Sequence, residues 1–354
     1  IKNVKSVVVP CTGGLRGIGA AVCAGIVAGC PEKELEILEE ITGEQKVEMK
    51  KMLDTMPMTI RKSDKEYIFD IQIKACAGGH SGYVEIAGFH TNVICVKKDD
   101  EIIREKAYEE QGSSCATDRS LLTVEKIIEF ADCVDVADVE EVLQRQIDYN
   151  WAIAEEGMTG NWGAAIGKTL MEAYGNSVHN RAKAMAAAGS DARMNGCELP
   201  VVINSGSGNQ GMTTSLPVIV YAKELNVSKE MMLLVVSNLI TIHMKTGIGR
   251  LSAYCGAISA GCGAGAGICY LYGGRAYEIS HVIVNAVAIN SGVVCDGAKA
   301  SCAAKIASAV EAGLLGLQMQ KNGKQFYGGD GLVEKGVELC IFTKKTPHMV
   351  EFML

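Results

Sequence analysis

Two stretches in the first third of the chain alternate between apolar and polar positions in the manner of β-strands. Residues 67–75 and 83–96 carry β-branched and aromatic side chains at alternating positions, a pattern typical of strands. The turn Gly78-Gly79 separates them, and the polar run 97–101 bounds the second. We therefore predict neighbouring strands. The elements predicted before them are a strand at residues 6–10 and helices from about Gly17 and from Pro31.

From Thr123 onward the apolar positions recur with helical spacing. Asp138 and Glu141, three residues apart, predict a capping box that starts a helix running toward Trp151. The later helix candidates, rich in Gly, Ala, Ser and Cys, are residues 163–188, 213–225, 228–245, 251–272, 276–293 and 298–314. The pattern predicts an α+β fold, with a mixed α/β region and small sheet at residues 1–118 and a large Gly/Ala-rich helical domain at 119–354.

Composition narrows the classes of partner. Apolar residues make up 48% of the 354 positions, enough to bury a sizeable core. With 41 acidic and 34 basic residues the net charge is -7, which provides no basic stripe for nucleic acid and favours a small-molecule partner. The uncharged run 251–274 is dominated by Gly and Ala, which drive membrane insertion poorly, so no membrane helix is expected.

Fourteen cysteines occur without a signal peptide or a compact disulfide framework, which favours a reducing cytoplasm and a metal site that uses a few of the thiols. Taken singly, each cysteine is more often a small buried apolar residue. The chain begins at Ile1 and reaches a strand almost at once, so we expect a segment upstream. A homodimer is the assembly considered, and the sequence does not decide it.

The segment 12–19 imitates a nucleotide-binding loop. Its TGGLRGIG sequence follows a predicted strand and opens a helix, as in short-chain dehydrogenases. None of the eleven tyrosines has Lys at the fourth following position, and the acidic ribose ligand expected at a second strand falls in a helical run. A tight turn before a packed helix is therefore the favoured interpretation.

Two Cys-Gly pairs near predicted helix ends carry the strongest chemical signal. Cys255 precedes Gly256, and Cys295 lies two residues before Gly297. Helix termini favour thiolates, which are the usual ligands of iron–sulfur clusters. The cysteines that follow at seven-residue intervals would lie about 10 Å along a continuous helix, too far to share one small cluster. We therefore take one ligand from each group and interpret two of the others, Cys262 and Cys269, as packing residues.

The segments RLSAYCGA (250–257) and VVCDGAKASCAAKI (293–306) resemble the cluster-binding half of the L-cysteine desulfidase and L-serine dehydratase alpha-chain family. Further landmarks are GYVEIAGFHTNVICV (82–96), the segment 203–222 that contains SGSGNQG, and FYGGDGL (326–332). Together they extend the resemblance over residues 1 to about 335. The tail after Val333 departs from the pattern expected of this family.

The resemblance implies a [4Fe–4S] cluster bound by three cysteines, with one iron open and no pyridoxal phosphate. Cys255 and Cys295 match two ligands. The third lies in an upstream GCTEP-like segment in the desulfidase branch, the alternative favoured here, or at a position nearest to Cys302 in the dehydratase branch. The implied reaction is β-elimination on a small amino acid, and conversion of L-cysteine to pyruvate, ammonia and sulfide is the version favoured here. L-Serine dehydration and a degenerate non-enzymatic homologue are the alternatives.

Removal of the α-proton requires a base, and His90 is the first candidate, with His80 second. Both could instead hydrogen-bond a backbone carbonyl at a strand end. Asn92 is a candidate for substrate binding beside His90. Lys299 and Arg250 lie near the ligand cysteines and could neutralise cluster charge, or be ordinary surface cations.

The Gly-rich stretch 205–211 precedes a predicted helix. Backbone N–H groups and short side chains at such a place can hold a carboxylate, although a flexible link has a similar composition. The candidate substrate-binding residues here are Ser205, Ser207, Asn209 and Gln210.

Overall fold

The computed structural model describes residue 4 and residues 7–38, 40–67, 69–88, 91–108, 118–227, 236–248 and 254–330. The chain forms two compact units. Unit 1 comprises residues 18–118, and unit 2 comprises residues 119–354 together with the N-terminal segment 2–17.

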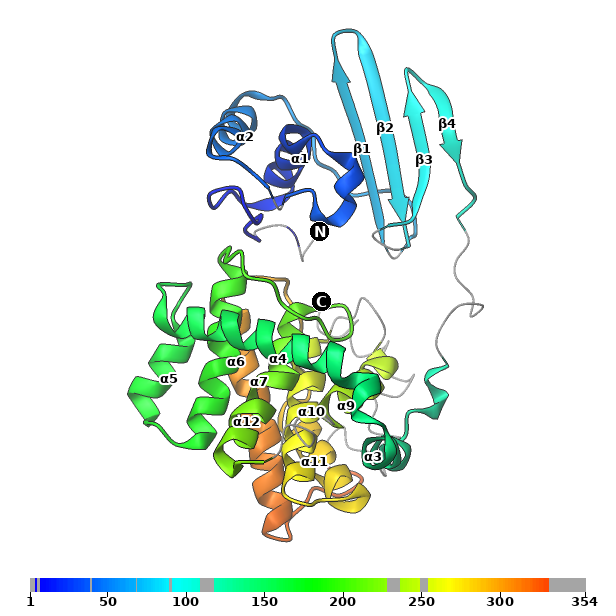
Figure 1. The fold of residues 1–354 in the computed structure, drawn as a ribbon. Helices are drawn as coiled ribbons and strands as arrows, with labels where there is room; N and C mark the ends of the chain where they lie inside the picture. The colour runs from blue at the N-terminus through cyan, green and yellow to red at the C-terminus, as the bar shows by residue number, and fades with distance from the viewer. Residues whose placement is uncertain are drawn as a thin grey trace. The chain divides into compact units, whose positions relative to one another are not determined.

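Unit 1 begins with helices and continues into a sheet (Figure 1). Its elements are α1 (Gly17–Ala28), the 3-10 helix η1 (Pro31–Glu36), α2 (Gly43–Thr55), β1 (Asp70–Ala77), β2 (His80–Ala87), β3 (Val93–Lys98) and β4 (Glu101–Glu105). A capping box starts α2: Gln45 N donates to Thr42 Oγ1 at 3.2 Å, and Thr42 N donates to Gln45 Oε1 at 2.9 Å. These bonds satisfy amides that a helix start leaves unpaired.

The sheet is an antiparallel meander in the order β1-β2-β3-β4. Gly78 and Gly79 have φ of 58° and 82°, the left-handed conformation that a two-residue hairpin turn requires. The expectation of a single strand over residues 83–96 is wrong, since β2 ends at Ala87 and β3 begins at Val93. Gly88, with φ 81°, breaks the alternation there.

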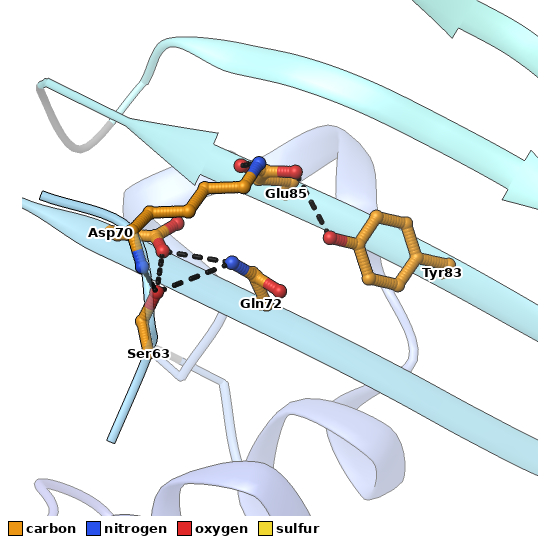
Figure 2. A network of polar contacts seen from close by, with 6 residues as sticks. Ser63, Asp70, Gln72, Tyr83 and Glu85 are labelled. Carbon is orange, nitrogen blue, oxygen red and sulfur yellow. Dashed lines mark hydrogen bonds and ion pairs between the residues drawn. The ribbon is translucent and has the colours of Figure 1, made fainter. Parts of the chain in front are cut away.

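A polar network lies on one face of this sheet (Figure 2). The Glu85 side chain, 5% exposed, forms an ion pair with Lys65 and accepts a hydrogen bond from Tyr83 Oη at 2.9 Å. Burial, followed by the neighbouring Glu85, raises the pKa of Tyr83. Asp70 accepts from Gln72 Nε2 at 2.8 Å and from the Ser63 hydroxyl. The network therefore holds the segment before β1 against β1 and β2.

Unit 2 is helical (Figure 1). Its elements are η2 (Arg119–Leu121), α3 (Val124–Cys133), α4 (Val136–Thr159), α5 (Ile166–Tyr174), α6 (Val178–Met194), α7 (Gly208–Leu225), α9 (Val236–Ile248), α10 (Gly256–Leu271), α11 (Ala276–Ile289) and α12 (Cys302–Lys321). Helix α10 is buried along nearly its whole length and packs against α7, α9, α11 and α12.

Glycines set the spacing of α10 and α12. A Cβ on Gly261 would stand 2.2 Å from the Ala309 carbonyl oxygen, and one on Gly265 would stand 2.7 Å from the Gly313 oxygen. Such distances are below van der Waals contact, so only glycine allows this approach. The small residues of the sequence therefore create close helix packing, which fixes where the first turn of each helix lies.

Several helix boundaries differ from those expected. The stretch 163–188 contains two helices, α5 and α6, because the chain turns at Gly175 with φ 77°. The capping box at Asp138 is wrong, since α4 begins at Val136 and its cap is Asp135, whose carboxylate accepts from Ala137 N at 3.0 Å. Helix α11 ends at Ile289 rather than residue 293, and α7 begins at Gly208, five residues earlier than expected.

The predicted strand at residues 6–10 is wrong in extent. Within the described residues it is a single bridge between Val8 and Arg16, closed by a Val9 N bond to Leu15 O at 2.9 Å. Thr12 Oγ1 donates to Val9 O at 2.7 Å, and Gly13 and Gly14 adopt positive φ. The segment thus forms a tight turn that bonds to itself.

A small antiparallel sheet followed by helices confirms the α+β prediction. Among the described residues no helix has both the length and the apolar character needed to cross a lipid bilayer.

Candidate active site

The structure brings Cys255, Cys295 and Cys302 together in unit 2. Cys255 caps α10, Cys302 is the first residue of α12, and Cys295 lies in the non-helical segment before α12. Cys255 N donates to Val293 O at 3.0 Å, and Tyr254 and Val294 form an antiparallel bridge. These backbone bonds join two segments that are 40 residues apart in sequence.

The thiol of Cys255 interacts with both of the other thiols. A hydrogen bond with Cys295, followed by burial, raises the pKa of Cys255, and Cys302 lies near enough to act on it electrostatically. Cys302 Sγ donates to Gly297 O at 3.5 Å. Helix α12 begins at Cys302 rather than at residue 298, so Cys295 and Cys302 do not share a continuous helix. The seven-residue spacing therefore does not separate these two thiols by two helical turns.

The donor set fits an iron–sulfur cluster better than a single ion. Three partly buried thiols are the ligand type that such clusters take from proteins. In the parts of the chain that the structure describes, no three His, Cys, Asp or Glu side chains are arranged to hold one metal ion. Each thiolate ligand of a four-iron cluster binds a separate iron, so three neighbouring thiols that do not converge on one point would suit a cluster.

Cys262 and Cys269 lie deep in α10, 1% and 2% exposed. Burial raises the pKa of each thiol to about 12, which keeps both thiols protonated at neutral pH. They pack in the helical core, whereas Cys255 stands at the start of the same helix.

A lysine, Lys305, lies close enough to Cys255 and Cys302 to interact with them electrostatically. Lys305 Nζ donates to Val294 O at 3.2 Å and pairs with Asp296, which also pairs with Lys299. Burial lowers the pKa of Lys305, but the bond to Asp296 and the charges of Asp296, Cys255 and Cys302 outweigh it, so its pKa is raised overall. Lys305 was not among the site residues predicted from the sequence. Arg250, which was expected here, lies outside the described residues.

The loop before α7 is a two-residue hairpin turn. Asn204 and Ser207 exchange backbone hydrogen bonds of 3.2 and 3.1 Å, while Ser205 and Gly206 take φ of 50° and 80°. Ser205 Oγ donates to Asn204 Oδ1 at 2.8 Å, and Ser207 Oγ accepts from Gln210 N at 3.4 Å. Both candidate serines thus take part in the turn and the helix cap.

Buried amides hold this loop in place. Asn150 is fully buried, accepts from Val202 N at 2.9 Å and donates to Ser215 Oγ at 3.0 Å. Asn204 Nδ2 donates to Asn238 Oδ1 at 2.9 Å, and Asn238 is paired in turn with Gln146. A Cβ at Gly211 would stand 2.0 Å from Val202 O, which explains why this position is glycine.

The first turn of α7 packs against Gly256, the residue that follows Cys255. The side chain of Gln210 lies against Gly256, where a Cβ would stand 2.6 Å from the Gln210 amide. Asn209 Oδ1 accepts from Arg193 Nη1 at 3.2 Å. Burial lowers the pKa of Arg193, and the charge of Cys302 opposes this shift. Arg193 was also not among the site residues predicted from the sequence. The sequence feature that could have indicated it is a cation that follows the run of small residues in α6.

The other candidate residues belong to unit 1. His80 Nδ1 lies 2.8 Å from Asp99 Oδ2, and the His80 side chain is 76% exposed. Asn92 Nδ2 donates to Ala87 O at 2.7 Å, and its Oδ1 accepts from Lys106 at 3.5 Å. His90 lies outside the described residues.

Comparison with known proteins identifies the class. The family model of the serine dehydratase alpha chain matches residues 32–344, and the chain belongs to this family, as the sequence resemblance predicted. The family supports a lyase type of activity.

Relatives cover most of the chain. It is 58% identical over 343 residues to a UPF0597 protein of Desulfitobacterium hafniense. The aligned region covers 96% of this chain and 80% of that protein. UPF0597 proteins of Lachnoclostridium phytofermentans and Treponema denticola are 49% and 43% identical, with 96% of this chain and 82% and 81% of those proteins covered.

Proposed function

We propose that this protein is an iron–sulfur-dependent lyase that carries out β-elimination on a small amino acid without pyridoxal phosphate. The observation that carries the proposal is the convergence of Cys255, Cys295 and Cys302 at the first turns of α10 and α12. The serine dehydratase alpha-chain family supports the lyase class.

Cys255, Cys295 and Cys302 would hold a [4Fe–4S] cluster through three of its irons. When bound, the cluster supplies a Lewis acid at its open iron, which polarises the β-substituent of the substrate. Cys302 is proposed as the third ligand because it lies beside the other two thiols. A cysteine in an upstream segment is the alternative ligand, and Cys302→Ser distinguishes them.

Side chains and backbone of the protein would bind the substrate and compensate the charge of the thiolates. The first turn of α7, with Asn209 and Gln210, offers N–H groups and polar side chains to an amino acid, and the turn residues Ser205 and Ser207 shape this loop. Lys305 offsets the negative charge of the cysteine thiolates.

A base must take the α-proton, and His90 is proposed for this role, with His80 second and Asn92 as a neighbouring substrate contact. Loss of the α-proton and the β-thiolate leaves aminoacrylate, which tautomerises to the imine and hydrolyses to pyruvate and ammonia. The thiolate leaves as sulfide, so atoms and electrons balance without an added oxidant or reductant.

L-Cysteine is the proposed substrate, because iron prefers a soft thiolate leaving group. L-Serine is the alternative, with water leaving in place of sulfide, and a pocket that rejects sulfur would favour it. A reducing cytoplasm suits both the free thiols and the cluster.

Anaerobically purified protein tests the proposal directly. Pyruvate, ammonia and sulfide should be released from L-cysteine without added pyridoxal phosphate or nicotinamide. If His90 is the base, His90→Ala should lower kcat by on the order of a hundredfold and keep the cluster colour, whereas His80→Ala should not. An intact cluster that yields no pyruvate from either amino acid would refute the lyase and favour a degenerate homologue.

A further inference from the structure

The partly buried guanidinium of Arg193 lies against the start of α7. Arg193 donates to Asn209 Oδ1 at 3.2 Å, and none of the ion pairs among the described residues joins it to a carboxylate. A Cβ on Gly208 would stand 2.6 Å from Arg193 Nε, so glycine gives the guanidinium its place on the helix backbone. A guanidinium has five N–H donors, and desolvated cations are normally paired with anions.

The start of α7 itself favours an anion at the same place. This helix has 18 residues, and the first N–H groups of an α-helix have no partner inside it. The Ser207 hydroxyl caps Gln210 N, three positions on. Arg193 and the helix start therefore both present donors and positive charge beside Gly208 and Asn209.

Gln210, the residue after Asn209, carries a buried hydrogen-bond acceptor. Gln210 is 7% exposed, and in the described part of the chain no donor reaches its buried Oε1. A buried acceptor left unpaired destabilises the fold, because it has lost its hydrogen bonds to water. The Gln210 amide packs on Gly256, directly after Cys255. A ligand with N–H donors at this point would satisfy Oε1.

We propose that Arg193 and Gln210 determine specificity by recognising the two charged groups of an α-amino acid. Arg193 and the α7 N-terminus hold the α-carboxylate, and Gln210 Oε1 accepts a hydrogen bond from the α-ammonium. The β-substituent then points toward the three cysteines. This inference rests on the proposed lyase function. It explains why a substrate would need both its carboxyl group, held by Arg193, and its amino group, held by Gln210.

Three ligands separate the contributions of the carboxylate and the ammonium to binding, measured on cluster-loaded protein. α-Methyl-L-cysteine keeps both charged groups but has no α-proton to lose, 3-mercaptopropionate lacks the ammonium, and cysteamine lacks the carboxylate. Dissociation constants are measured by calorimetry under anaerobic conditions. Wild-type protein should bind α-methyl-L-cysteine more tightly than either truncated probe, and equal binding of all three overturns the proposal.

Arg193→Met should weaken α-methyl-L-cysteine and 3-mercaptopropionate by roughly 10- to 100-fold and leave cysteamine unchanged, with partial rescue in Arg193→Lys because lysine keeps the charge without the fork. Arg181→Met is the matched control, since Arg181 lies on the same helix and pairs with Glu224. It should bind all three probes as wild type does.

Gln210→Met should weaken α-methyl-L-cysteine and cysteamine by roughly 10-fold and leave 3-mercaptopropionate unchanged. Gln318→Met, at an exposed position on α12, is its control. If Arg193 serves only as a counter-ion of the cysteines, Arg193→Met will change the visible spectrum of the cluster and affect all three probes equally, which overturns the assignment. Pyruvate release from L-cysteine with unchanged probe selectivity in both variants refutes this inference alone.

Discussion

Cys255 and Val293 are joined by a backbone hydrogen bond of 3.0 Å, from the amide of one to the carbonyl of the other. This bond fixes the start of α10 against the segment that carries Cys295, two residues after Val293. The positions of these two cysteines therefore depend on backbone pairing as well as on side-chain packing.

Replacement of the converging cysteines should remove the cluster. We expect Cys255→Ser, Cys295→Ser and Cys302→Ser each to bleach the visible absorption and reduce bound iron after anaerobic reconstitution. Cys262→Ala, deep in α10, should keep the colour and lose only around 1 kcal/mol of stability. A colourless, iron-free wild-type protein would contradict the cluster, and a fully coloured Cys302→Ser would assign the third ligand elsewhere.

Glycine at the contact between α10 and α12 should be essential for stability. Gly261→Ala places a Cβ 2.2 Å from the Ala309 oxygen, and we expect a loss of about 1–3 kcal/mol in the free energy of unfolding by urea. Gly25→Ala is the control, because the structure shows open space around Gly25 in α1. There alanine should be neutral or stabilise by up to about 1 kcal/mol. Equal effects of the two changes would argue against the close helix contact.

Asn150 should matter both for stability and for substrate binding. Asn150→Ala leaves Val202 N without its acceptor, so we expect a loss of about 1–3 kcal/mol and, because the loop 202–207 moves, a raised KM. Gln144→Ala, at a partly exposed position on the same helix, where the amide bonds only to Asp148 one turn on, should change neither quantity. An unchanged KM in a destabilised Asn150→Ala protein would separate the loop from the substrate site.

Glu311 should stabilise unit 2 in a pH-dependent way. A hydrogen bond from His179 and, after the opposing effect of burial, one from Lys183 lower its pKa to about 2. The folded-state pKa lies below the usual value of about 4.3, so the stabilisation is present above pH 4.3 and is lost as pH falls toward 2.

The free energy of unfolding by urea should accordingly be lower in Glu311→Gln than in wild type above about pH 4.3, and this difference should shrink below that pH. Glu129→Gln, at an exposed position of α3, should show little difference at any pH. A Glu311→Gln difference that grows in acid would have the wrong sign for this ion pair.

Local sequence patterns predicted the fold class and singled out Cys255 and Cys295. The features that were not predicted depend on contacts between residues distant in sequence. The alternation at residues 67–75 predicted β1, and the Gly neighbours singled out Cys255 and Cys295. The break between β2 and β3 was not predicted because apolar residues continue on both sides of it. The role of Arg193 depends on Gly208 and Asn209, which follow it after a helix end and a hairpin turn. No periodicity of the sequence encodes such a contact.

The loop before α7 is held by Gln146, Asn150, Asn204 and Asn238, and all four are uncharged amides. Primary amides do not titrate, and hydrogen bonds between neutral groups are little screened by salt. The loop should therefore keep one conformation across changes of acidity and ionic strength that would loosen a loop held by ion pairs. A dependence of amino-acid affinity on pH or salt would then come from the substrate and from the charged groups near it, because the amide framework stays constant.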